Sequence, residues 1–215
     1  MRVYKFYSRK WAKDALIKQR LKIATLDDLN DPFEFLDATS LQPEQRSAWH
    51  KAILGVFEKN GLISFSETWS NPVLWSHYGD RHFGAALGFD VSNERLRKVI
   101  YRSKRGKLPD LSMCSKDEKF RRMNLATHTK FKHWEYEQER RVFVTLNDAD
   151  ENGRFFKDFD KEIVLREFII GARSKLTSAE VKEAQGDNGS IDIITTRLAF
   201  NSYKIVRQKR SDLQK

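Results

Sequence analysis

Short apolar and aromatic runs alternate along the chain with stretches in which apolar residues recur at helical spacing. Residues 3–7 alternate aromatic and basic side chains, which predicts a first β-strand. The last two apolar runs are close enough together to predict a closing hairpin. Further strands are expected over residues 21–25, 62–66, 83–89, 99–101, 137–144, 162–171, 191–196 and 203–206.

Capping residues mark the helices expected between these strands. Ser8 can cap a helix that runs to about residue 20, and Pro43 opens one that ends at Asn60-Gly61. A short helix with proline in its first turn is expected over residues 71–79. Capping boxes open two more, one running from residue 115 to about 133 and one starting at residue 177.

Together these elements predict an α+β fold. We expect a single domain over residues 1–207, with a mainly antiparallel sheet flanked by helices, followed by a basic C-terminal tail over residues 208–215. The length of 215 residues and the 15 Phe support one globular core.

The net charge of +10 favours contact with polyanions, so nucleic acid is a candidate partner, although spread basicity also serves solubility. Cys114 is the only cysteine, which excludes an intramolecular disulfide and a thiolate metal site. No run of about 18 apolar residues occurs, so no membrane partner is expected. The first residues contain no apolar signal segment, and the cytoplasm is therefore the expected location.

The strand expected over residues 137–144 carries the main candidate chemistry. If it is extended, Glu137, Glu139 and Arg141 share one face, with the two carboxylates about 6.5–7 Å apart. Such a pair is costly to bury unpaired and useful in a cleft, and the neighbouring guanidinium would keep it ionised. The alternative is an exposed strand start whose charges are solvated.

A polar turn at residues 30–34 is a second candidate because it can present a carboxylate at a cleft. The alternative is a loop with a local Asx turn. A third group lies on residues 66–78, where core packing is the alternative for the aromatic members and no second His stands at metal-ligand spacing. The candidate cleft residues are Asn30, Asp31, Phe33, Glu34, Ser66, Trp75, His77, Tyr78 and Trp134.

Common catalytic signatures are absent from the sequence. There is no GxGxxG or GxxxxGK[ST] phosphate loop, no HExxH, no CxxC and no nucleophile elbow.

Two further hypotheses about the function of the chain stay open. Asp31, Glu34, Glu137 and Glu139 could hold a divalent metal in an effector that acts on nucleic acid. The chain could also be a non-catalytic binding module in which the glutamates pair with Arg141 or Lys5.

The motifs NDPFE at residues 30–34, FS at 65–66, WSHY at 75–78 and WxxExExR at 134–141 occur in this order. Their combination resembles a widespread bacterial family catalogued only as a domain of unknown function. The resemblance covers residues 3 to about 172 and implies a fold and site candidates without a reaction.

The order of elements is also similar to the ADP-ribosyltransferase fold, especially its DNA-targeting toxin branch. This resemblance implies NAD as the cofactor, Glu139 as the catalytic carboxylate at the start of a late strand, and Glu137 orienting the acceptor. It also implies a toxin or phage-defence effector, with an antitoxin or defence-system protein as partner. In place of the early His or Arg that grips NAD in that fold, the first strand here offers Tyr4, Lys5 and Tyr7. The cofactor-binding residues would be Tyr4, Lys5, Ser66, Trp75, His77 and Tyr78.

Overall fold

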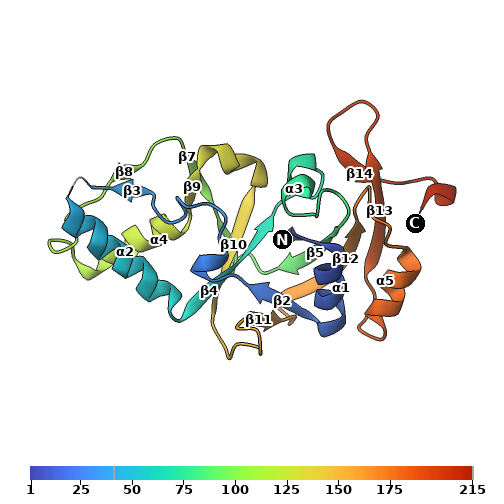
Figure 1. Ribbon diagram of the computed structural model, residues 1–215, viewed down its shortest axis with the longest axis horizontal. Coiled ribbons are helices and arrows are strands. Elements are labelled where there is room, and N and C mark those ends of the chain that lie inside the picture. Colours follow the sequence, from blue (N-terminus) through green and yellow to red (C-terminus); the bar gives the residue numbers. More distant parts are fainter. Residues whose placement is uncertain (41, 215) are drawn as a thin grey trace.

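The computed structural model describes residues 1–40 and 42–214, and a large twisted sheet runs through its centre (Figure 1). The strand order is β14-β13-β12-β5-β1-β4-β10-β6. Neighbouring strands are antiparallel except β12 and β13, which are parallel. The predicted α+β domain with a mostly antiparallel sheet is confirmed. The strands are β1 (Arg2–Tyr7), β4 (Asn60–Ser66), β5 (Ala85–Val91), β6 (Arg97–Lys98), β10 (Glu139–Thr145), β12 (Ile163–Ile170), β13 (Asp192–Leu198) and β14 (Ile205–Arg207).

Three short strand pairs lie outside the central sheet. β2 (Arg20–Ile23) pairs with β11 (Phe155–Asp158) in antiparallel orientation. The other two pairs are parallel: β3 (Ala38–Thr39) with β8 (Gly106–Lys107), and β7 (Ile100–Arg102) with β9 (Thr129–Phe131). Strands of two or three residues are too short to show an alternating pattern, which is why the sequence predicted few of them.

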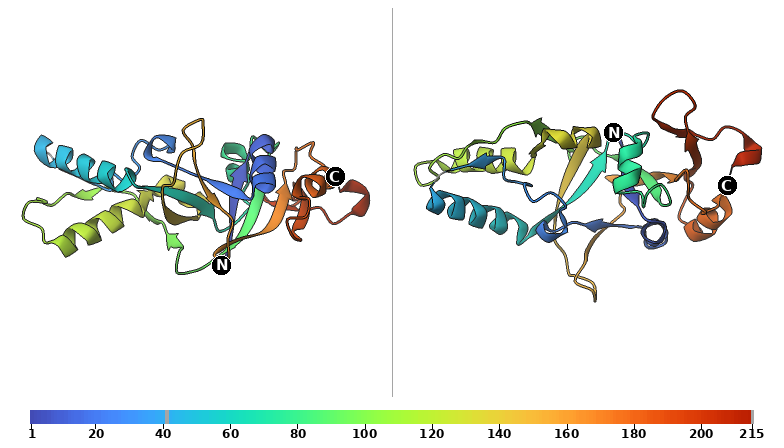
Figure 2. Two further views of the ribbon diagram at one scale, coloured as in Figure 1. Left: turned by 90° about the horizontal axis from the view of Figure 1, so that it is seen from below. Right: turned by 45° about the horizontal axis from the view of Figure 1, so that its top comes forward.

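The helices divide between the two ends of the molecule. α2 and α4 lie side by side and extend from one end of the sheet, while α5 lies at the other end (Figures 1 and 2). A separate apolar cluster that includes Trp49, Ile53 and Phe57 joins α2 to the sheet. The helices are α1 (Arg9–Lys18), α2 (Pro43–Phe57), α3 (Pro72–His77), α4 (Lys116–Thr127) and α5 (Ser178–Gln185), with 3₁₀ helices η1 (Leu26–Asp28), η2 (Lys132–Glu137) and η3 (Ser211–Leu213).

The segment before β10 differs from its prediction. The helix expected to reach about residue 133 ends at Thr127, because residues 129–131 leave it to pair with β7 as β9. η2 follows and ends at Glu137, and Gln138 then adopts a left-handed conformation with φ 46°. Glu137 is therefore the last residue of a 3₁₀ helix, and the strand that was expected from residue 137 begins at Glu139.

The central sheet opens between β1 and β4. Every residue of β1 pairs with β5, and every residue of β10 pairs with β4, but β1 and β4 share the single pair Tyr4–Ser66. Beyond that pair the two strands diverge, so side chains from both strands can face a common space. This opening positions the candidate site.

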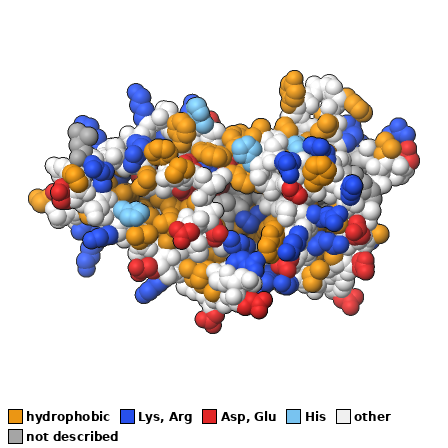
Figure 3. All heavy atoms as spheres, viewed as in Figure 1, with side chains coloured by type: hydrophobic (Ala, Val, Ile, Leu, Met, Phe, Trp, Pro, Cys, Tyr) orange, Lys and Arg blue, Asp and Glu red, His pale blue; other side chains and the backbone are white. Residues whose placement is uncertain are grey.

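Basic side chains are spread along the whole length of the face drawn in Figure 3, with hydrophobic side chains between them. In the expected tail, Gln208 is buried and its backbone N–H donates to the Thr195 carbonyl, and η3 follows. Lys215, the last residue of that tail, lies outside the described residues. Among the described residues, no helix combines the length and apolar character that a bilayer crossing requires.

Candidate functional site

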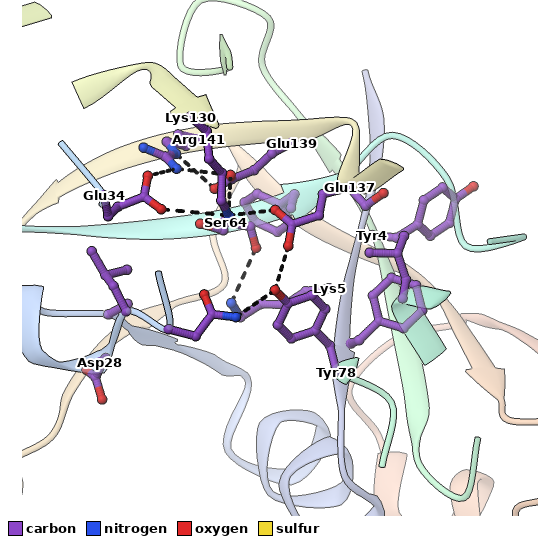
Figure 4. Close-up of a pocket in the computed structure, with 17 residues that line it drawn as sticks. Tyr4, Lys5, Asp28, Glu34, Ser64, Tyr78, Lys130, Glu137, Glu139 and Arg141 are labelled. Carbon is purple, nitrogen blue, oxygen red and sulfur yellow. Dashed lines mark hydrogen bonds and ion pairs between the residues drawn. The ribbon is translucent and has the colours of Figure 1, made fainter. Parts of the chain in front are cut away.

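A cavity of about 250 Å³ occupies the opening between β1 and β4 (Figure 4). Its walls come from β1, β4, β10, α3 and the segment that follows β2. Segments far apart in the sequence therefore meet there. The polar residues that line it are Tyr4, Lys5, Asp28, Asn30, Glu34, Ser64, Ser66, Tyr78, Lys130, Glu137, Glu139 and Arg141.

A row of side chains crosses three adjacent strands at the edge of this opening. Tyr4 on β1 pairs with Ser66 on β4, and Ser66 pairs with Glu139 on β10. Residues paired directly across antiparallel strands project to the same face of the sheet. The register therefore places these three side chains on one face of the sheet, and we call the three residues the cross-strand row.

Arg141 forms ion pairs with two carboxylates, those of Glu139 and Glu34. Its Nε lies 2.8 Å from Glu139 Oε1 and its Nη2 lies 3.0 Å from Glu139 Oε2, so the contact is bidentate. Nη2 also forms an ion pair with Glu34, and Nη1 donates to the Thr127 carbonyl at 2.8 Å. The Arg141 side chain is 1% exposed, so the guanidinium is fixed by these contacts rather than solvated.

Lys130, on β9, completes a buried ionic cluster. Its Nζ lies 2.6 Å from Glu137, 3.3 Å from Glu139 and 3.7 Å from Glu34. We call these residues, with Arg141, the carboxylate network. It contains three carboxylates and two cations, all of them buried, and each carboxylate lies within ion-pair distance of Lys130.

Charge and burial have opposite effects on the pKa values of Glu139, Glu34 and Lys130. Burial opposes ionisation of Glu139, but the charges of Arg141 and Lys130 outweigh it and lower the pKa of Glu139 to about 2. At Glu34 burial prevails over the same two cations and raises the pKa. Burial also disfavours the Lys130 ammonium, yet the surrounding carboxylates raise its pKa. Glu139 is therefore an anion at neutral pH.

Lys5 is a third cation of the cavity and differs from the other two. Its Nζ donates to the Ser64 carbonyl at 3.3 Å, and among the described residues it forms no ion pair. Burial lowers the pKa of Lys5 to about 8, against the smaller opposing effect of the Glu139 charge. Lys5 can thus offer a positive charge to a ligand at neutral pH.

Tyr78, the residue that follows α3, connects the turn after η1 to the network. Its hydroxyl donates to Glu137 Oε1 at 2.5 Å and accepts from Asn30 Nδ2 at 2.9 Å. Burial and the Glu137 charge raise the pKa of Tyr78, so the phenol stays protonated. The ring is held as one wall of the cavity.

Two residues expected to bind a cofactor do not line the cavity. Trp75 is fully buried, packs edge-on against Phe6 at 5.1 Å and donates its Nε1 hydrogen to the Trp69 carbonyl. Its apolar surface is used in the core, which was the alternative for this residue. His77 is exposed, and its ring faces Trp134 and Tyr136 outside the cavity. The prediction that these two side chains line the cleft is corrected.

Only some residues of the turn at 30–34 line the cavity, and another holds the turn itself together. Asn30 and Glu34 line the cavity as expected. Asp31 instead accepts the Phe33 N–H at 2.9 Å, which is the Asx turn that stood as the alternative. The Phe33 ring is 59% exposed and lines a separate cavity. The prediction that Asp31 and Phe33 line the cleft is therefore corrected.

Two further residues, Trp134 and Tyr101, lie against the network. Trp134 does not line the cavity, but its ring lies 4.9 Å from Lys130 Nζ. The Tyr101 hydroxyl accepts the backbone N–H of Glu139 at 2.8 Å and so fixes the start of β10. The sequence analysis missed Lys130 and Tyr101. A charge count could have pointed to Lys130, because three buried carboxylates need more than Arg141 to balance them.

The position of Lys130 bears directly on the metal hypothesis. Its ammonium occupies the point shared by Glu34, Glu137 and Glu139, where a divalent cation would have to lie. Among the described residues, no group of three or more His, Cys, Asp and Glu side chains is arranged to hold a metal ion. The site therefore gives no support to metal-dependent chemistry at these carboxylates.

Comparison of the chain with protein-family models, curated proteins and solved structures gave no match. The resemblances to the domain-of-unknown-function family and to the ADP-ribosyltransferase fold therefore stay predictions. The geometry of the cavity supplies the grounds for a functional proposal.

Proposed function

We propose that this protein is an ADP-ribosyltransferase-like enzyme that uses NAD. The observation that carries the proposal is the cross-strand row, in which an ionised Glu139 is paired with Ser66 and shares a sheet face and a cavity with Tyr4. The order of elements supports it as well. An early strand is followed by a helix, a later strand leads to the proline-containing α3, and a late strand begins at the glutamate.

The chemistry of the lining fits the sugar end of NAD. The cavity of about 250 Å³ lies just below the range of about 300–1,000 Å³ that encloses a whole drug-sized ligand, so it suits part of a dinucleotide. Tyr4, Phe6 and Tyr78 supply aromatic surface for a planar ring, and Lys5 supplies a positive charge for the pyrophosphate. When bound, NAD supplies an ADP-ribosyl group whose bond to nicotinamide can be broken.

Glu139 would stabilise the positive charge that develops at the sugar carbon as this bond breaks. Arg141 and Lys130 keep Glu139 ionised and in place, so its charge is preorganised before the reaction begins. Tyr78 and Lys130 orient Glu137 at the same cavity, where it would align an acceptor hydroxyl or amino group. A water-poor site strengthens each of these electrostatic effects.

One observation favours a second candidate, a non-catalytic binding module. Each glutamate of the network already has cationic partners, which is the arrangement expected if the acids only hold the fold together. In that case the loss of any one of them would lower stability, and no chemistry would depend on Glu139 in particular.

The test is to incubate the purified protein with NAD and measure nicotinamide release together with NAD binding by calorimetry. We expect binding and slow turnover, both dependent on an intact cavity. Absence of both with a folded protein would remove the enzyme proposal and leave the binding module.

A further inference from the structure

A second cavity, of about 270 Å³, shares Lys130 with the first. It is bounded by the turn before β3, the end of β7 and the strand β9. Lys130 lines both cavities, and Phe33 in the second is followed directly by Glu34 in the first. A ligand in the second cavity would therefore be a close neighbour of the carboxylate network.

Two phenylalanine rings are exposed at this cavity. Phe33 is 59% exposed and Phe131 is 44% exposed. Phe131 stacks on His133 with the ring centroids 4.6 Å apart, which holds the ring in place. Held, exposed aromatic rings beside a hollow are suited to stacking with a planar group.

The charge around these rings is strongly positive. Residues 97–107 contain six Lys or Arg and no Asp or Glu. Three of the six, Arg102, Lys104 and Arg105, line the cavity and are exposed. Arg105 is anchored, because it donates to the Leu36 and Ala38 carbonyls at 2.6 and 2.8 Å, and this fixes the loop against β3.

Acidic charge at this cavity is neutralised within the protein. Asp37 also lines it, but its carboxylate is fully buried and pairs with Arg122 at 3.3 Å. The surface offered to a ligand is therefore aromatic and cationic.

We propose that this second cavity binds single-stranded nucleic acid, with an unpaired base stacked between Phe33 and Phe131 and the adjoining phosphates held by Arg102 and Lys104. Stacking on aromatic side chains combined with a basic groove is the general mode of single-strand binding. A cavity of this size takes one planar ring, and the stacking surface is unavailable to bases paired in a duplex. Binding itself needs no NAD. If the protein is a transferase, the bound strand would also be the acceptor of the ADP-ribosyl group, and this part alone rests on the proposed function.

The test measures fluorescence anisotropy of labelled 12-nucleotide DNA and RNA single strands, and of the matching DNA duplex, with the full chain and without NAD. We expect single strands to bind more tightly than the duplex. The double variant Phe33→Ala/Phe131→Ala should weaken single-strand binding by about tenfold or more. Lys104→Ala should reduce the slope of log affinity against log salt by about 0.7, the value for one phosphate contact on a single strand.

Phe200→Ala is the matched control, since Phe200 is 93% exposed on the hairpin between β13 and β14. It should leave the affinity within about twofold of the original value. Thermal melting of each variant shows whether the fold is retained, which is expected because the altered side chains are exposed. The proposal is overturned if single strands do not bind, if the duplex binds better, or if the phenylalanine double variant binds as well as the control.

Addition of NAD separates this inference from the proposed enzyme. Nicotinamide release stimulated by the bound strand supports both statements. Binding that persists without any NAD turnover leaves the nucleic-acid site standing and counts against the transferase alone.

Discussion

Replacing Glu139 by Gln separates a catalytic carboxylate from a structural one. The change removes one negative charge from the network while keeping the size of the side chain. Arg141 would retain Glu34 and the Thr127 carbonyl, and Lys130 would retain Glu137 and Glu34. Neither cation is left without a partner, so the loss of stability should be limited.

The expected loss of stability follows from the contacts that Arg141 and Lys130 retain. Breaking a buried ion pair by removing one partner costs about 3–5 kcal/mol, and the retained partners place this variant at or below about 3 kcal/mol. For a chain of this length each kcal/mol lowers Tm by about 2–4 °C, so a fall of at most about 6–12 °C is expected. If Glu139 stabilises the reacting sugar, turnover of NAD should fall by a factor of about 100 to 1,000 at a temperature where the variant is folded.

Glu34→Gln is the matched control. Glu34 also contacts Arg141 and Lys130 and is similarly buried, but it lies outside the cross-strand row. Its loss should lower Tm by a comparable amount while most of the turnover is kept. Calorimetric melting and nicotinamide release give the two readouts. Equal losses of turnover in both variants, in proportion to their losses of stability, would refute a special role for Glu139.

Further predictions concern the other members of the site. Tyr78→Phe removes the hydroxyl that donates to Glu137 and should lower the free energy of unfolding by about 1.5–3 kcal/mol in urea titrations; no change would contradict the contact. Because the pKa of Glu139 is about 2 instead of its ordinary 4.5, the stability it provides is complete above pH 4.5, and acid titration should show its loss as pH falls toward 2. For Lys5, with a pKa of about 8 instead of 10.5, the unfolded chain holds the extra proton, so stability should rise between pH 8 and 10.5 while NAD affinity falls; Lys5→Met should abolish both trends. EDTA should leave turnover unchanged, since Lys130 occupies the place of a metal, and a loss restored by added Mg²⁺ would contradict this.

The parts of the fold that follow from local pattern were predictable. The capping boxes at Ser115 and Thr177 open helices as expected, because the reciprocal hydrogen bonds depend only on residues three apart. The closing hairpin is confirmed as β13 and β14. The structure of the segment before β10 depends on the pairing of β9 with β7. No local sequence signal indicates a pairing partner about thirty residues away.

In the candidate site, too, the features that depend on long-range contacts could not be predicted from the sequence. Alternation along a strand was the stated reason for bringing Glu137 and Glu139 together, and that reason was wrong because Glu137 ends η2. The two carboxylates meet through Lys130, whose contribution depends on where β9 lies in three dimensions. Trp75 could not be assigned from the sequence, because an aromatic residue on a short helix suits a core and a cleft equally well.

A crystal structure of the protein with NAD bound would test the central claim most directly. We expect the nicotinamide riboside to lie in the opening between β1 and β4, with the sugar within hydrogen-bond distance of Glu139 and a planar ring packed against Tyr4 or Tyr78. NAD bound elsewhere, or a carboxylate network closed against it at saturating NAD, would contradict the account.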